Sequence, residues 1–124
     1  MDITPFIPSD RQVIDGYGDG QFCVSGTWRP GPCIILPDRT LDWDVEGFDS
    51  LSIDSFAPVM AAEPKVEILL LGCGPRMQLL PKALRVALRE AGVVTEVMDT
   101  GAACRTYNVL LSEARRVGAA LLPA

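Results

Sequence analysis

The sequence predicts an α/β fold, a single domain over residues 1–124, organised around one buried strand. An almost purely apolar run at 66–71, bounded by Pro64 and Gly72, is typical of a strand covered on both faces. Residues 79–91 follow with apolar side chains at helical spacing, and a second strand-like run comes next. The first half instead alternates short apolar runs with glycine and proline turns, which is typical of β hairpins. We therefore expect hairpins followed by a right-handed βαβ unit.

The chain is predicted to begin with a lead-in and one hairpin. Residues 1–10 contain two prolines and are expected to be extended, with apolar side chains docked on the core. Residues 12–15 and 21–25 are the strands of a hairpin, joined by a glycine-rich turn at 16–20. Because this turn lies between antiparallel strands and opens no helix, a structural role is favoured over phosphate binding.

The hairpin region as a whole spans 11–54, and its later part repeats the pattern of turns and strands. Trp28 and Trp43 are expected to be buried or half-buried, since large aromatic side chains mostly serve the core. The elements expected here are a turn cluster at 28–32, a strand at 33–36, a tight turn at 37–40, a partner strand at 41–43 and a further short strand within 48–53.

A small helix at 56–62 comes next, with Ser55 as its N-cap and Pro64 ending it. The βαβα unit then spans 64–122. In its first helix, Pro81 suits the first turn and Gly92 suits the C-terminal cap. The second strand of the unit is predicted at 93–98.

The last helix is predicted to start with Asp99 or Thr100 as its N-cap. Gly118 is expected to end it, and residues 119–122 are expected to return as a short strand at the sheet edge. The predicted buried stripe of this helix consists of Tyr107, Leu110, Leu111, Ala114 and Val117.

Composition narrows the possible functions. The net charge of −5 argues against a general nucleic-acid binder, because binding to phosphate backbones needs clustered Lys and Arg. The sequence has no histidine, which excludes mechanisms that need an imidazole. We expect no metal and no cofactor, because no Cys-x-x-Cys pair and no complete cofactor motif is present. The scattered thiols are Cys23, Cys33, Cys73 and Cys104.

A cytoplasmic location is expected. Unpaired cysteines suit a reducing compartment, and no apolar run is long enough to span a membrane. The first five residues contain no basic region and no continuous apolar segment, so neither a secretory signal nor a transit peptide is expected.

The candidate site is the rim where both strands of the βαβ unit end. A crossover unit makes its strands parallel, so the loops that follow them lie on the same edge of the sheet. Ligands favour this edge, free N–H groups at helix starts favour anions, and Arg76 and Arg105 could add charge-assisted contacts. The candidate residues of this rim, for a ligand or a partner, are Gly72, Cys73, Gly74, Arg76, Asp99, Thr100, Gly101, Cys104, Arg105, Thr106 and Asn108.

Two specific chemistries remain as alternatives for the rim. A dinucleotide fingerprint would need glycine where Met77 stands, and Pro75 removes an N–H donor that would face a phosphate. Asp99 stands where a ribose-binding acid would sit, but helix capping explains it equally well. A reactive thiol at Cys73 or Cys104 would need a pKa lowered by a helix start and an arginine, and an unreactive buried cysteine is the favoured alternative.

Three stretches, at 16–18, 67–74 and above all 98–110, resemble a family of small, mostly uncharacterised bacterial and archaeal domain proteins. Its eukaryotic relatives are the mitochondrial complex I (NADH:ubiquinone oxidoreductase) assembly factor 3 and the adipogenesis-associated domain protein. The resemblance covers residues 14–122 and implies three layers, with a central mixed sheet, helices on one side and the N-terminal hairpins on the other.

The resemblance also implies a function through protein partners, because no enzymatic activity is established for the family. We therefore expect a non-enzymatic, assembly-factor-like bacterial protein whose partners include respiratory complex I subunits or assembly proteins. The alternative is a small-molecule or anion-binding protein, or an enzyme, that uses the same rim. Exposed apolar residues of the hairpins could also support a homodimer.

Overall fold

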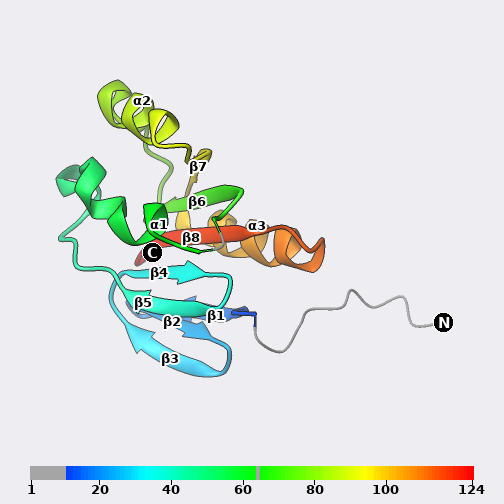
Figure 1. The fold of residues 1–124 in the computed structure, drawn as a ribbon. Helices are drawn as coiled ribbons and strands as arrows, with labels where there is room; N and C mark the ends of the chain where they lie inside the picture. Colours follow the sequence, from blue (N-terminus) through cyan, green and yellow to red (C-terminus); the bar gives the residue numbers. More distant parts are fainter. Residues whose placement is uncertain (1–10, 64) are drawn as a thin grey trace.

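The structure is a computed structural model that describes residues 11–63 and 65–124, so the predicted lead-in at 1–10 lies outside the described residues. Its centre is a five-stranded sheet with the strand order β5-β4-β8-β6-β7 (Figure 1). Strand β6 is parallel to β7 and β8, whereas β4 is antiparallel to β5 and β8, so the sheet is mixed, as predicted. The strands are β4 (Cys33–Leu36), β5 (Arg39–Asp42), β6 (Ile68–Cys73), β7 (Thr95–Met98) and β8 (Val117–Leu122).

A second, antiparallel sheet is made by β1 (Ile14–Gly18), β2 (Gln21–Val24) and β3 (Thr27–Pro30). The predicted hairpin is confirmed, but residues 16–18 belong to β1 and not to its turn. A third strand also replaces most of the turn cluster predicted at 28–32. Two-residue turns explain both differences, because 19–20 and 25–26 adopt positive φ throughout and leave the flanking residues free to pair.

Short helices replace the strand that was predicted within 48–53. The 3₁₀ helices η1 (Phe48–Ser50) and η2 (Ile53–Phe56) lead into helix α1 (Ala57–Met60). Ser55 lies inside η2 and is not the N-cap of α1. Trp43 holds this segment, because its indole N–H donates to the Ser55 carbonyl oxygen at 2.7 Å, and its buried side chain confirms the expectation for that tryptophan. Trp28, in contrast, is 55 % exposed.

Helix α2 (Lys82–Glu90) follows the sequence pattern, with Leu84 and Leu88 buried and Gly92 at a positive φ of 84° after the last turn. Helix α3 (Thr100–Ser112) is shorter than predicted. The chain leaves α3 at Ala114, whose φ is 61°, and residues 117–118 enter β8.

Strand β8 lies in the middle of the sheet, between β4 and β6, so the prediction of an edge strand at 119–122 is wrong. All six of its residues are buried. A central position needs an apolar segment covered on both faces, and 117–122 supplies one. A Cβ at Gly118 would meet Val66 Cγ1 at 3.1 Å and the Ile35 carbonyl oxygen at 3.3 Å, so this glycine serves close packing and does not end the helix.

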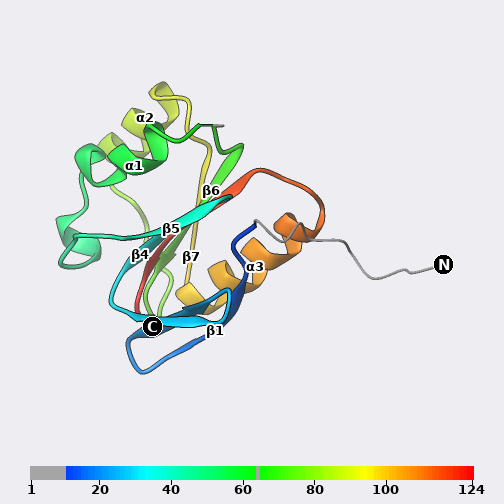
Figure 2. The ribbon, with the colours of Figure 1, turned by 60° about the horizontal axis from the view of Figure 1, so that its bottom comes forward.

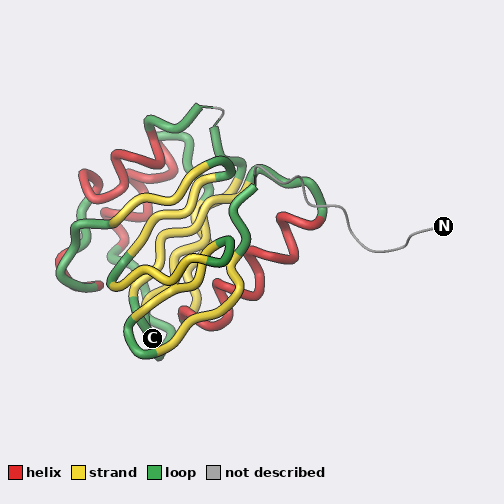
Figure 3. The backbone as a smooth tube through the Cα atoms, turned by 90° about the horizontal axis from the view of Figure 1, so that it is seen from below, coloured by secondary structure: helices red, strands yellow, loops and turns green. Residues whose placement is uncertain are grey.

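Two hydrophobic clusters cover the two faces of the central sheet. Leu69 and Leu71 of β6 belong to the cluster that includes α1 and α2, whereas Leu70 belongs to the cluster with the three-stranded sheet and α3. The layers are visible in Figures 2 and 3. The predicted α/β layers are confirmed, but α3 lies on the hairpin side. The crossovers through α2 and α3 run in opposite directions across the sheet, and right-handed connections then place the helices on opposite faces.

Candidate functional site

Thr100 joins three elements at the rim. Its side chain is fully buried, and its Oγ1 accepts a hydrogen bond from the Gly74 N–H at 2.9 Å and donates one to the Leu122 carbonyl oxygen at 2.6 Å. Its own N–H donates to the Gly74 carbonyl oxygen at 2.9 Å. The ends of β6 and β8 are thereby fixed to the start of α3, so Thr100 is a structural residue of the rim.

Gly72 is required by the same close approach. A Cβ at this position would lie 2.9 Å from Leu121 Cδ2 and 3.1 Å from both Cα and Oγ1 of Thr100. Gly74 follows at a φ of 104°, which side chains rarely tolerate. The two glycines therefore allow α3 to start directly against β6, a role that needs no bound phosphate.

Asp99 is the N-cap of α3, as one of the two predicted alternatives. Its Oδ1 accepts from the Ala102 N–H at 2.9 Å. With the Thr100 N–H bonded to Gly74, two N–H groups of the helix start are already paired within the protein. An anion at this helix start would compete with these bonds.

Cys73 fixes the loop that leaves β6. Its buried Sγ lies 3.1 Å from the Arg76 carbonyl oxygen and 3.2 Å from that of Met98, and it accepts from the Gln78 N–H at 3.2 Å. The Gln78 side chain amide donates back to the Cys73 carbonyl oxygen at 3.1 Å. These contacts close the loop at both ends.

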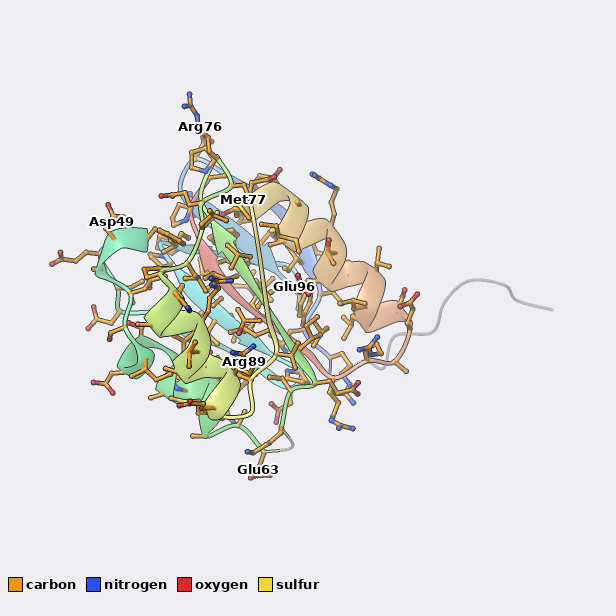
Figure 4. All side chains as sticks on the ribbon, turned by 90° about the horizontal axis from the view of Figure 1, so that it is seen from above. Asp49, Glu63, Arg76, Met77, Arg89 and Glu96 are labelled. Carbon is orange, nitrogen blue, oxygen red and sulfur yellow. The ribbon has the colours of Figure 1, made fainter. Side chains whose placement is uncertain are left out.

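The residues that follow Cys73 and Gly74 therefore point outward from a fixed base. We call residues 75–79 the rim loop. Met77 is 53 % exposed, Leu79 is 82 % exposed, and Arg76 is exposed as well. Figure 4 shows Arg76 projecting from the tip of the molecule, with Met77 close behind it. The rim loop thus presents two large apolar side chains and one cation to solvent.

The other half of the rim borders a shallow hollow of about 190 Å³ against β1. Gly101 lies beneath the Tyr17 hydroxyl, since an added Cβ would collide with it and would meet Arg105 Nη1 at 3.3 Å. The hollow brings a cation, a phenol, a thiol and a carboxylate together. Its polar and reactive lining residues are Asp15, Tyr17, Cys104, Arg105 and Asn108.

Asn108 and its neighbour Tyr107 hold the start of β1. The Asn108 amide accepts from the Ile14 N–H at 3.1 Å and donates to the Ile14 carbonyl oxygen at 2.7 Å. The Tyr107 hydroxyl donates to the Gln12 carbonyl oxygen at 2.7 Å. The Asn108 amide therefore bonds the backbone of β1 as a neighbouring strand would. Thr106, two residues earlier on α3, is half-buried.

The thiols and carboxylates of the rim and its surroundings form no cluster suited to a metal ion among the described residues. No group of three or more acidic or cysteine side chains could hold a metal ion in residues 11–63 and 65–124. All four cysteines are free and buried. Burial raises the pKa of the Cys104 thiol to about 11, against the lowering effect of Arg105, and it raises the pKa of Cys33 to about 12.

We expect Cys104 to react slowly with a thiol reagent in the native protein. With a pKa of about 11, roughly one thiol in a thousand is ionised at pH 8, and the thiolate is the nucleophile. Dithionitrobenzoate absorbance at pH 8 should rise slowly in buffer and rapidly in guanidinium, with Cys104→Ser identifying the site. Fast labelling of Cys104 in the folded protein would instead support a reactive thiol at the rim.

Sequence reasoning missed two features of this region. It placed Leu79 in the helical stretch 79–91 and considered Met77 only as the residue that interrupts a dinucleotide fingerprint, whereas α2 begins at Lys82 and both side chains are exposed before it. It also gave no indication that Lys82, Arg85 and Arg89, which are exposed on α2, line a groove of about 420 Å³ between α2 and β7. The apolar residues at 77 and 79 are a signal that the sequence does contain, but the groove becomes visible only when α2 and β7 are placed side by side.

The fold and rim define a class of protein: a layered α/β scaffold whose rim glycines, threonine and asparagine hold elements together, with an exposed loop at one end. The chain belongs to the family described as "Protein of unknown function (DUF498/DUF598)", whose model matches residues 14–122. In the described residues, no helix is long and apolar enough to cross a membrane.

Three relatives give the range of similarity. The human protein named NADH dehydrogenase (ubiquinone) 1 alpha subcomplex assembly factor 3 is 38 % identical over 93 % of this chain and 62 % of its own length. An uncharacterized protein of Rhodobacter capsulatus is 46 % identical over 89 % of this chain and 83 % of its own. A crystal structure described as an outer membrane protein from Bartonella henselae has a TM-score of 0.83 at 36 % identity, covering 95 % and 98 % of the two chains. The chain thus spans about three fifths of the assembly factors that it matches.

Proposed function

We propose that this protein is a non-enzymatic assembly factor that binds a protein partner through the rim loop and assists the assembly of respiratory complex I. The observation that carries the proposal is the rim loop itself, in which Met77 and Leu79 are exposed above a base fixed by Cys73. The name of the human relative supplies the partner class.

The physical argument rests on preorganisation. Large exposed apolar side chains are common at protein interfaces, and methionine is enriched there. A flexible loop would lose conformational entropy on binding, whereas a loop held at Cys73 and Gln78 has lost part of that freedom already. Arg76 at the tip adds a charge that can pair with an acidic partner group.

The same geometry favours a partner over a small ligand. The hollow beside Arg105 has a volume of about 190 Å³, below the roughly 300–1,000 Å³ that is usual for ligand pockets. The Asp15 carboxylate lines it together with Arg105, so an anion there would meet a like charge. Thr100 and Asn108 already use their side chains in internal hydrogen bonds.

Photocrosslinking in the cells that encode the protein tests this proposal. A photoreactive phenylalanine analogue at position 79 should crosslink to a complex I subunit or assembly protein, identified by mass spectrometry. Position 109 is the matched control, because Val109 is 55 % exposed on the outer side of α3. Equal yields of the same products from both positions, or products from position 79 that contain no complex I protein, would contradict the proposal.

A further inference from the structure

A second surface lies away from the rim, where α2 passes over the start of β7. The groove there is lined on the helix side by Lys82, Arg85 and Arg89. Its floor is apolar and includes Val86, Val93 and Val94, the last 58 % exposed. No acidic residue lines it, although the chain carries a net charge of −5. The volume of about 420 Å³ lies within the range that is usual for binding sites.

Strand β7 presents a free edge to this groove. It is the last strand of the central sheet and pairs only with β6 in the described structure. The Leu69 N–H donates to the Val94 carbonyl oxygen, so the backbone groups of 94, 96 and 98 face β6. By the alternation of a strand, the N–H and C=O groups of Thr95 and Val97 face outward, away from the sheet.

The side chains along β7 show which face of the sheet the cations of α2 lie on. Val97 packs with the cluster that includes α2, whereas Met98 packs with the cluster that includes α3. Glu96 alternates with Val97 and thus lies on the α3 side; Figure 4 shows Arg89 and Glu96 on different sides of β7. The Thr95 hydroxyl, which lines the groove, is buried without a hydrogen-bond partner among the described residues.

We propose that this groove binds an extended acidic segment of a partner protein, which adds to the free edge of β7 as a further strand. The spacing of charges supports a strand as the occupant. Arg85 and Arg89 are separated by roughly 6 Å along the helix axis, at 1.5 Å per residue. Alternate side chains of a strand are separated by roughly 6.6 Å. A segment with acidic residues at positions i and i+2 therefore matches both arginines, while its backbone bonds Thr95 and Val97.

A synthetic peptide tests this inference independently of the rim loop. The probe is a capped heptapeptide in which glutamate alternates with valine between terminal threonines, and its control carries lysine in place of glutamate. We expect saturable binding of the acidic peptide by fluorescence anisotropy and no saturation with the lysine peptide. The double variant Arg85→Glu with Arg89→Glu should bind the acidic peptide with an affinity lower by roughly tenfold or more. Arg39→Glu on the opposite edge strand, an exposed site, should leave binding unchanged.

Amide exchange measured by NMR separates a strand from other occupants. The acidic peptide should slow exchange at the amides of Thr95 and Val97, which face away from β6. Sodium decanoate, an anion with an apolar body, should leave these two amides unprotected. The inference is overturned if the peptide does not bind, if it binds the charge-reversed protein equally well, or if it binds without protecting Thr95 and Val97.

Discussion

Replacing Thr100 by valine is expected to lower the free energy of unfolding by about 3 kcal/mol. Valine keeps the shape of the buried side chain but removes the hydroxyl. The Gly74 N–H and the Leu122 carbonyl oxygen would then remain buried without their hydrogen bonds. Leaving such groups unpaired costs roughly 1–3 kcal/mol each. Urea unfolding followed by circular dichroism measures the difference.

The matched control is Thr100→Ser, which keeps the hydroxyl and loses one methyl group. Its expected loss is about 1 kcal/mol, the usual cost of one buried methyl group. If the valine variant were as stable as the serine variant, the junction of β6, α3 and β8 would not depend on the hydroxyl.

Replacing Gly72 by valine is the second change with a large expected effect, a loss of about 3 kcal/mol in the free energy of unfolding. Its Cβ would lie 2.9 Å from Leu121 Cδ2 and 3.1 Å from the backbone Cα of Thr100. Leu121 is fully buried and the Thr100 backbone is held by Gly74, so neither group can move away easily. The same urea experiment measures the loss.

Gly47→Val is the control for the second change. Gly47 has an extended backbone, with a φ of 175°, and a Cβ there would meet no atom within 4 Å. We expect its stability to change by less than about 0.5 kcal/mol. A similar loss in both variants would show that the Gly72 position is not limited by the approach of α3.

The sequence pattern was sufficient for elements whose burial repeats along the chain. Leu84 and Leu88 on α2, with Gly92 after it, define that helix locally, and the apolar run of β6 defines a covered strand. The resemblance of 98–110 to a known family correctly indicated membership. Each of these signals lies within a short window of residues.

The position of β8 could not be predicted because it depends on distant partners. Val117 falls at helical spacing from the α3 residues, and Gly118 is a common helix stop, so local pattern favours a longer helix. The strand is central because Ala120 pairs with Ile34 on one side and with Leu71 on the other. The distribution of helices over both faces follows from the same pairing.

The structural roles of the rim residues were hidden for a similar reason. A glycine before a helix is compatible with phosphate binding or with close packing, and only the distance from Gly72 to Thr100 distinguishes the two. In the sequence, Asn108 is only a polar residue within a predicted helix. Its hydrogen bonds to Ile14 become apparent only once β1 is located beside that helix. The exposed Leu79 could be read as an apolar helix residue until the start of α2 at Lys82 is known.

The most direct test of the proposed role of the rim loop uses a strain that lacks the gene for this protein. A variant of the rim loop is expressed in that strain, and its ability to replace the wild-type protein is measured. Met77→Asp with Leu79→Asp changes exposed residues only, so its free energy of unfolding should equal that of the wild type. We predict that this variant fails to restore complex I on native gels, whereas wild type and Val109→Asp restore it. Normal complex I in the deletion strain, or full rescue by the double variant, would contradict the account.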